Sequence, residues 1–180
     1  MQNKKKRERL ENAFEWVDAL VSAAVIVVLL FTFFFRTVGV EGTSMVPTLE
    51  DGDRLIISHL FYQPQQGDIV VIVQPDSETP AIIKRVIAVA GQTVDIDFSR
   101  GIVMVDGQVL EEPYISEPTY MKRDVQFPVT VPEGCVFVMG DNRNRSLDSR
   151  DSSIGMIDQQ SILGKAVFRL FPFQKMGWIP

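Results

Sequence analysis

The sequence predicts a mostly β fold that follows a single N-terminal membrane-spanning helix. Beyond residue 37, short runs rich in Val, Ile and Phe recur between turn residues, and no segment there keeps a 3.6-residue period over three turns. Before that point, the chain from Ala19 to Phe35 is apolar except for Ser22 and Thr32. We therefore expect one transmembrane helix and then one β domain.

The apolar run, extended to residues 16–38, is long enough to cross about 30 Å of hydrocarbon at about 1.5 Å per residue. The alternative is a cleavable secretory signal, which we disfavour because the run is long and residues 36–41 contain no small-x-small cleavage site. The basic segment 4–9 precedes the run, which places the N-terminus in the cytoplasm. We expect residues 1–15 to be cytoplasmic, 16–38 to form a signal anchor in the plasma membrane, and 39–180 to be extracytoplasmic.

Short strands separated by turns account for most of the β domain. Asp106-Gly107 is a strong signal for a two-residue hairpin turn. Residues 114–124 are expected to form an exposed loop. The expected strands are Val38 to Glu41, Arg54 to Ser58, Asp68 to Val73, Ala81 to Ala90, Thr93 to Ile96, Ile102 to Val105, Val109 to Leu110, Gln126 to Val131, Val136 to Met139 and Ile162 to Phe171.

Composition excludes several classes of function. The chain carries 18 basic and 23 acidic side chains, and beyond residue 18 the balance is 13 to 19. Nucleic-acid binding favours a basic face, so we expect no nucleic-acid partner. One cysteine, Cys135, and one histidine, His59, allow neither an intrachain disulfide nor a His/Cys metal cluster. We expect no metal and no cofactor, with Cys135 a small apolar strand residue and His59 a surface residue.

Ser44 is the first candidate for chemistry, because it lies in a short segment directly after the apolar run. A loop serine is usually solvated or caps a turn. Lys84, however, lies inside an apolar run that is typical of a buried strand. Burial disfavours the ammonium form, so a lysine with an ordinary pKa of about 10.4 can become neutral near neutral pH. A neutral amine can take the proton of a serine hydroxyl.

Strand alternation supports Lys84 as the base. It places Lys84 on one face with Ile82 and Val86, whereas Arg85 points to the other. The alternative for this pair is two cations that snorkel from an edge strand. A histidine-dependent protease is disfavoured because His59 stands alone.

A third segment, residues 140–150, is dense in polar side chains directly after an apolar strand. Its plain interpretation is a solvated loop. Asp and Arg at this density can instead form a rigid charge-assisted network, and Ser146 could supply a hydroxyl that fixes the position of a buried lysine.

These residues resemble the bacterial type I signal peptidases, or leader peptidases, a family of membrane-anchored serine proteases with a Ser/Lys dyad. Four segments carry the resemblance in order: Gly42 to Leu49, Gly67 to Val71, Ile83 to Val86, and Gly140 to Arg150. The resemblance implies a β domain of the signal peptidase/LexA-like type. It also implies the Gram-positive kind of enzyme, because the chain has one span and no room for a large second β domain.

The resemblance implies a role for each candidate residue. Ser44 would be the nucleophile, Lys84 the general base, and Ser146 the hydroxyl that orients Lys84. Asp148 and Arg150 would form a structural pair that braces the site.

Gly42 departs from the Gram-negative members, which commonly have a serine there whose hydroxyl helps to hold the oxyanion. The departure leaves the Ser44 N–H, with a neighbouring amide, as the expected oxyanion hole. A serine at Gly42 is expected to keep or raise activity, and a valine to lower it.

The substrates implied are secretory preproteins, whose signal peptide lies in membrane lipid and whose cleavage site emerges beside Ser44. An extended peptide would add as a strand, with only small side chains accepted at positions −1 and −3. The expected substrate-binding residues are Val40, Gly42, Met45, Leu49, Ile82 and Ile83.

Two other functions stay open from the residues alone. A LexA-like self-cleaving protein shares the dyad and the β fold, although the span and the missing DNA-binding domain oppose it. A non-catalytic, membrane-anchored module that binds extended peptides would need neither Ser44 nor Lys84.

Overall fold

The computed structural model describes residues 14–28, 35–59, 62–73 and 81–180. The chain divides into two units, residues 1–36 and 37–180. In the first unit, residues 14–28 are helical. Within the described ranges, no helix has both the length and the apolar character needed to cross a membrane. Residues 29–34 of the expected span lie outside the described residues, and a strand begins at Phe35.

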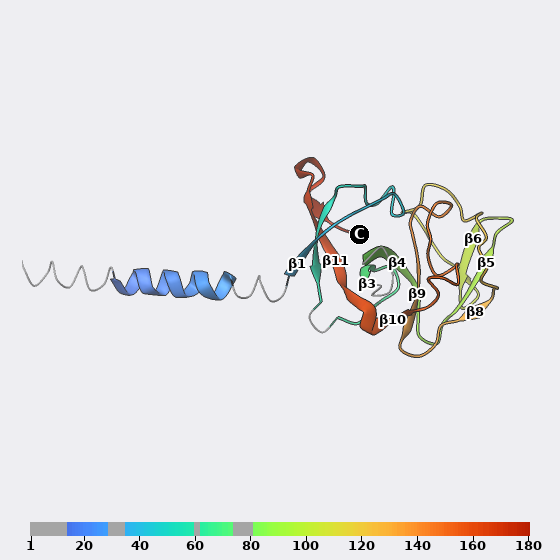
Figure 1. Ribbon diagram of the computed structural model, residues 1–180, viewed down its shortest axis with the longest axis horizontal. Helices are drawn as coiled ribbons and strands as arrows, with labels where there is room; N and C mark the ends of the chain where they lie inside the picture. The colour runs from blue at the N-terminus through green and yellow to red at the C-terminus, as the bar shows by residue number, and fades with distance from the viewer. Residues whose placement is uncertain (1–13, 29–34, 60–61, 74–80) are drawn as a thin grey trace, which may run out of the picture. The chain divides into compact units, whose positions relative to one another are not determined.

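The second unit is built mostly from strands, which confirms the predicted β class (Figure 1). The larger sheet contains β1 (Phe35–Gly39), β2 (Arg54–Ser58), β3 (Ile69–Val73), β4 (Ala81–Val89), β9 (Cys135–Met139), β10 (Ile157–Asp158), β11 (Ile162–Phe171) and β12 (Gly177–Trp178). The smaller sheet contains β5 (Thr93–Asp97), β6 (Ile102–Val105), β7 (Gln108–Val109) and β8 (Val129–Thr130). Two 3₁₀ turns, η1 (Gln159–Ser161) and η2 (Phe173–Lys175), adjoin β11.

The strand order of the larger sheet positions the functional site. The order is β1-β2-β11-β3-β4-β9-β10, with β12 paired to β11. Three strands thus separate β1 from β4, yet residues of both strands line one cleft. The sheet must therefore curl until its first strand approaches β4, as strong strand twist allows.

Two backbone edges remain open where the sheet curls. β1 is the edge strand of the larger sheet. β4 pairs with β3 along residues 81–85, whereas its pairing with β9 begins only at Arg85. The first four residues of β4 therefore have a strand partner on one side only, among the residues that the structure describes.

Three apolar clusters form the core. The first packs the loop after β1 against the larger sheet and includes Val40, Met45 and Leu49. The second joins the two sheets through residues such as Phe137 and Val103, and the third lies along β3, β4 and β9. Burial of these side chains is the main favourable term that fixes the loop on the sheet.

Local sequence patterns predicted most strands closely. Three strands, Arg54–Ser58, Ile102–Val105 and Ile162–Phe171, have the expected bounds. Asp106 and Gly107 have φ of 52° and 77°, as a type I′ hairpin turn requires. The expected strand Gln126 to Val131 shrinks to Val129–Thr130, because Pro128 lacks the N–H that a strand ladder needs.

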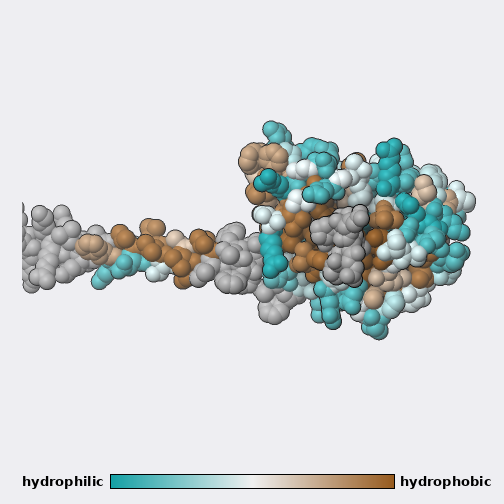
Figure 2. All heavy atoms as spheres, in the orientation of Figure 1, coloured by the Kyte–Doolittle hydropathy of each residue, from teal (hydrophilic) through white to brown (hydrophobic). Residues whose placement is uncertain are grey.

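An exposed apolar tip ends the second unit. It contains Leu170, Phe171, Phe173, Met176 and Trp178, of which Trp178 is 81% exposed. The segment projects from the β domain at the end of β11 (Figure 1), and Figure 2 shows its apolar colouring beside polar neighbours. Lys175 in the same tip pairs with Glu50 at 2.6 Å.

Candidate active site

The loop between β1 and β2 carries Ser44, which is half-buried. The Val40 N–H donates to the Asp53 carbonyl at 2.8 Å and closes the base of the loop. Met45 and Leu49 are 1% and 0% exposed and anchor the loop from within. Ser44 is therefore held on a short, well-packed loop rather than on a free one.

Gly42 gives this loop its shape. Its φ is +84°, a conformation that favours glycine, and its N–H donates to Asp51 Oδ1 at 2.7 Å. Two residues later, the Ser44 N–H has no acceptor among the described residues. That free donor lies next to the Ser44 hydroxyl, where an oxyanion hole needs one.

Lys84 meets Ser44 from β4. Its side chain is buried, with 4% exposure, and Nζ donates to Ser44 Oγ at 2.8 Å and to the Ile83 carbonyl at 3.1 Å. Burial lowers the pKa of Lys84 to about 8, although the negative charges of Asp148 and Asp141 oppose the shift. A neutral amine in this position can accept the proton of Ser44.

The turn that follows β9 packs directly against the Ser44 loop. The Asn142 N–H donates to the Ser44 carbonyl, and Asn142 Nδ2 to the Thr43 carbonyl, both at 3.0 Å. A Cβ at Gly140 would overlap the Ser44 carbonyl oxygen and Ser146 Oγ. Only glycine allows this close approach of two backbones.

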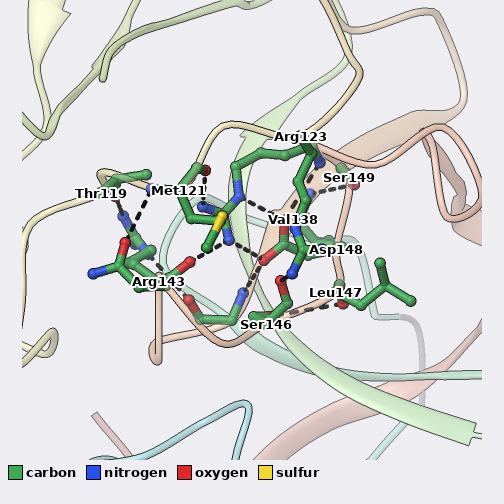
Figure 3. Close-up of polar contacts among 12 residues, drawn as sticks. Thr119, Met121, Arg123, Val138, Arg143, Ser146, Leu147, Asp148 and Ser149 are labelled. Atoms are coloured by element: carbon green, nitrogen blue, oxygen red, sulfur yellow. Dashed lines mark hydrogen bonds and ion pairs between the residues drawn. The ribbon is translucent and has the colours of Figure 1, made fainter. Parts of the chain in front are cut away.

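Asp148 and Arg150 form a fully buried bidentate pair in the same turn. Arg150 donates to the two Asp148 oxygens at 2.8 and 2.9 Å, and Gly140 N–H donates to Asp148 Oδ2 at 3.0 Å. Figure 3 shows Asp148 and Ser146 beside Arg143 in this network. The network fixes the turn that supports Ser44.

Ser146 lies in the turn but not on Lys84. It is fully buried, and its Oγ donates to the Leu147 carbonyl at 3.4 Å. Among the described residues, no hydrogen bond joins it to Lys84 Nζ. The expected contact is thus absent here, and the Ile83 carbonyl supplies the second partner of Lys84.

Arg85 was not expected to belong to the site. It faces away from Lys84, as alternation predicted, and its guanidinium binds both Asp141 oxygens at 2.8 and 2.9 Å. Asp141 also accepts from Thr48 Oγ1 at 2.5 Å, and the ring of Tyr114 lies 3.9 Å from Arg85 Cζ. Arg85 is 2% exposed, so the surface alternative for this pair of cations does not hold. The signal in the sequence that could have indicated a buried role for Arg85 was the presence of a second cation, beside Lys84, in the same apolar strand.

A second arginine ties the 110–121 segment to the same turn. Arg143 Nε donates to the Gly140 carbonyl at 3.1 Å, and its Nη1 lies 2.5 Å from Glu112 and 3.2 Å from Thr119 Oγ1. Burial raises the pKa of Glu112 and Arg143 opposes that shift. Nothing local in the sequence around Glu112 indicated this long-range contact.

A cleft of about 180 Å³ opens at the Ser44–Lys84 pair. Its volume is below the roughly 300 Å³ of a small-molecule pocket, which suits small side chains better than a bulky ligand. Its lining residues are Val38, Gly39, Glu41, Ser44, Ala81, Ile82, Ile83 and Lys84.

The cleft contains two of the six residues expected to bind substrate, Ile82 and Ile83. The side chains of Val40, Met45 and Leu49 lie in the first core cluster, because the loop needs them as anchors, and Ile83 belongs to that cluster as well as to the cleft lining. Gly42 borders the Ser44 loop but is not among the residues that line the cleft.

Metal and cofactor ligands are not gathered here. In the part of the chain that the structure describes, no three His, Cys, Asp or Glu side chains are grouped to hold a metal ion. Cys135 and His59 are not among the residues that line the cleft.

Comparison with known proteins decides the family. Residues 13–171 match the model of the family described as "Signal peptidase, peptidase S26". The chain belongs to this family. A "Probable signal peptidase I-1" of Synechocystis is 44% identical over 91% of this chain and 85% of its own. A signal peptidase I of Bacillus licheniformis is 38% identical over 98% of each chain.

A solved signal peptidase I from Enterococcus faecalis is 31% identical, with a TM-score of 0.48 over 58% of this chain and 97% of that one. The assignment to type I signal peptidases, and with it the assignment as a serine endopeptidase, is confirmed by the family match and the relatives.

Proposed function

We propose that this signal peptidase removes N-terminal signal peptides from secretory preproteins by means of a Ser44/Lys84 dyad. The observation that carries the proposal is the 2.8 Å approach of Lys84 Nζ to Ser44 Oγ within an apolar, buried environment. Geometry and a lowered pKa together suit a lysine that acts as general base.

The reaction proceeds through an acyl-enzyme. Neutral Lys84 takes the proton of Ser44 as Oγ attacks the carbonyl carbon of the −1 residue, and the Ser44 N–H stabilises the oxyanion. Lys84 then gives that proton to the departing amine of the mature protein, and the peptide bond breaks. Lys84 next takes a proton from water, which attacks the ester carbonyl. Lys84 returns this proton to Ser44 Oγ as the ester bond breaks, so the signal peptide leaves with a new C-terminal carboxyl group and the free serine and neutral lysine are restored.

An extended peptide fits the open backbone edges of the cleft. β1 and the first four residues of β4 each have an unpaired edge, and residues of both line the cleft. A peptide laid between them can form ladder hydrogen bonds with both edges. The small volume beside Ile82 and Ile83 favours small side chains at −1 and −3.

We further propose that the enzyme is anchored in the plasma membrane, with residues 39–180 extracytoplasmic. The apolar N-terminal run supports this, and so does the exposed tip with Phe173 and Trp178, since aromatic side chains favour the lipid–water interface. External protease should digest the β domain in intact protoplasts. Protection until the cells are lysed would contradict the orientation.

Cleavage of a preprotein tests the dyad. The detergent-solubilised full chain is incubated with a secretory preprotein, and the new N-terminus is sequenced. We expect correct cleavage by the parent and by Ser116→Ala, a variant of an exposed loop serine, and none by Ser44→Ala or Lys84→Ala. Full cleavage by either dyad variant would remove that residue from the mechanism. Retained peptide binding without any cleavage by the parent would favour a binding module, and cleavage of only its own chain a self-cleaving protein.

A further inference from the structure

Glu41 is an unexplained charge in the cleft. Among the described residues that line the cleft, two are charged, Glu41 and Lys84. Lys84 is buried and engaged with Ser44, whereas the Glu41 side chain is exposed. Its neighbour Val40 is buried in the core, whereas Glu41 is exposed and is one of the residues that line the cleft.

The Glu41 carboxylate is available to a ligand. The other acids of the loop are engaged: Asp51 by the Gly42 N–H, Glu50 by Lys175 and Asp53 by Arg169. Among the described residues, Glu41 has no such hydrogen bond or ion pair. The carboxylates that act on the charge of Lys84 are Asp148 and Asp141. Glu41 is not one of them.

An extended substrate would bring one side chain toward this carboxylate. In a strand, successive side chains point to opposite faces. If the −1 and −3 side chains enter the shallow space beside Ile82 and Ile83, the −2 side chain points back toward solvent, past the exposed rim of the cleft to which Glu41 belongs.

We propose that Glu41 is a specificity-determining residue that sets a charge preference at position −2 of the substrate, favouring Lys or Arg over Asp or Glu. This inference rests on the proposed function. The interaction is between exposed groups, so we expect roughly a three- to tenfold preference in kcat/KM for Lys over Glu at −2, which weakens as salt screens the charges.

The test uses peptide substrates that differ only at −2, with Lys, Gln or Glu, and the full-length enzyme with Glu41, Glu41→Gln or Glu41→Lys. The Lys/Glu ratio of kcat/KM should exceed one for the parent, approach one for Glu41→Gln and fall below one for Glu41→Lys. Glu133→Lys, at an exposed turn before β9, makes the same charge change outside the cleft and should keep the parental ratio.

An unchanged ratio in Glu41→Gln and Glu41→Lys would overturn the inference. This outcome is distinct from failure of the proposed function. In that case, even the peptide with Gln at −2 would not be cleaved in a Ser44-dependent way.

Discussion

The side chains of Lys84 and Ser44 meet at 2.8 Å, although forty residues separate them in the chain. The contact joins a central strand of the larger sheet to a loop at its edge. Its geometry depends on the turn after β9, whose residues Gly140 and Asn142 contact the backbone of the Ser44 loop.

The protonation state of Lys84 should control the pH dependence of activity. The neutral amine is the active form, so kcat/KM should rise with pH through about 8, the value to which burial lowers the pKa of Lys84. Lys84→Arg should be as inactive as Lys84→Ala, because a guanidinium does not deprotonate. Lys122→Arg, on an exposed loop, should keep the parental profile. An active Lys84→Arg enzyme would exclude Lys84 as the base.

Gly140→Ala should damage activity more than folding. The added methyl group overlaps the Ser44 carbonyl and Ser146 Oγ, and a displacement of about 1 Å at a catalytic group can cost roughly 100-fold in rate. Gly177→Ala is the matched control, since its Cβ would enter open space. Measurement of both kcat and the thermal unfolding temperature of each variant separates the effect on activity from the effect on folding. A parental kcat in Gly140→Ala would show that the turn does not position Ser44.

The loss of stability caused by substitutions at Gly42 should follow the backbone strain that each new residue introduces. With φ of +84° and open space around the site, a side chain is limited by conformation rather than by contact. We expect Gly42→Asn to be tolerated best, Gly42→Ser to cost about 1 kcal/mol of stability, and Gly42→Val to cost more. In Gly42→Ser, activity should therefore rise only if the stabilisation of the oxyanion by the new hydroxyl exceeds the effect of the backbone strain. Equal unfolding temperatures for the three variants would contradict the left-handed backbone at Gly42.

Breaking the Asp148–Arg150 pair should destabilise the enzyme. Removal of one partner of a buried ion pair lowers the free energy of unfolding by roughly 3–5 kcal/mol. The midpoint temperature of thermal unfolding should therefore be lower in Asp148→Asn than in the parent by on the order of 10 °C. The fraction that folds should also show its activity midpoint at lower pH, because the charge of Asp148 raises the pKa of Lys84. Glu133→Gln, at an exposed turn, also neutralises one carboxylate and should keep the parental unfolding temperature. An unfolding temperature equal to that of the parent would refute the bracing role.

Local pattern was sufficient for most strands, although not for β8, β10 or β12, and it drew attention to Ser44 and Lys84. Alternation within one apolar run correctly separated Lys84, which reaches Ser44, from Arg85, which reaches Asp141. Local pattern did not predict whether a side chain lies in the core or in the cleft where this depends on which strands lie next to one another. Val40 and Met45 look like pocket residues in sequence, but the curl of the sheet turns them into the core. The role of Arg143 at Glu112 depends on the same long-range topology.

Strand addition of the substrate at the edges beside the cleft, as proposed above, makes the enzyme selective for conformation before it is selective for sequence. An α-helix uses its backbone N–H and C=O groups internally and has none to offer to β1 or to the first residues of β4. A folded sheet likewise offers only its own unpaired edge. The mature part of a secreted protein, once folded, is thereby spared even where its sequence would suit the cleft. Any helix in the signal peptide must also unwind before the residues on the N-terminal side of the cleavage site can form hydrogen bonds with these edges.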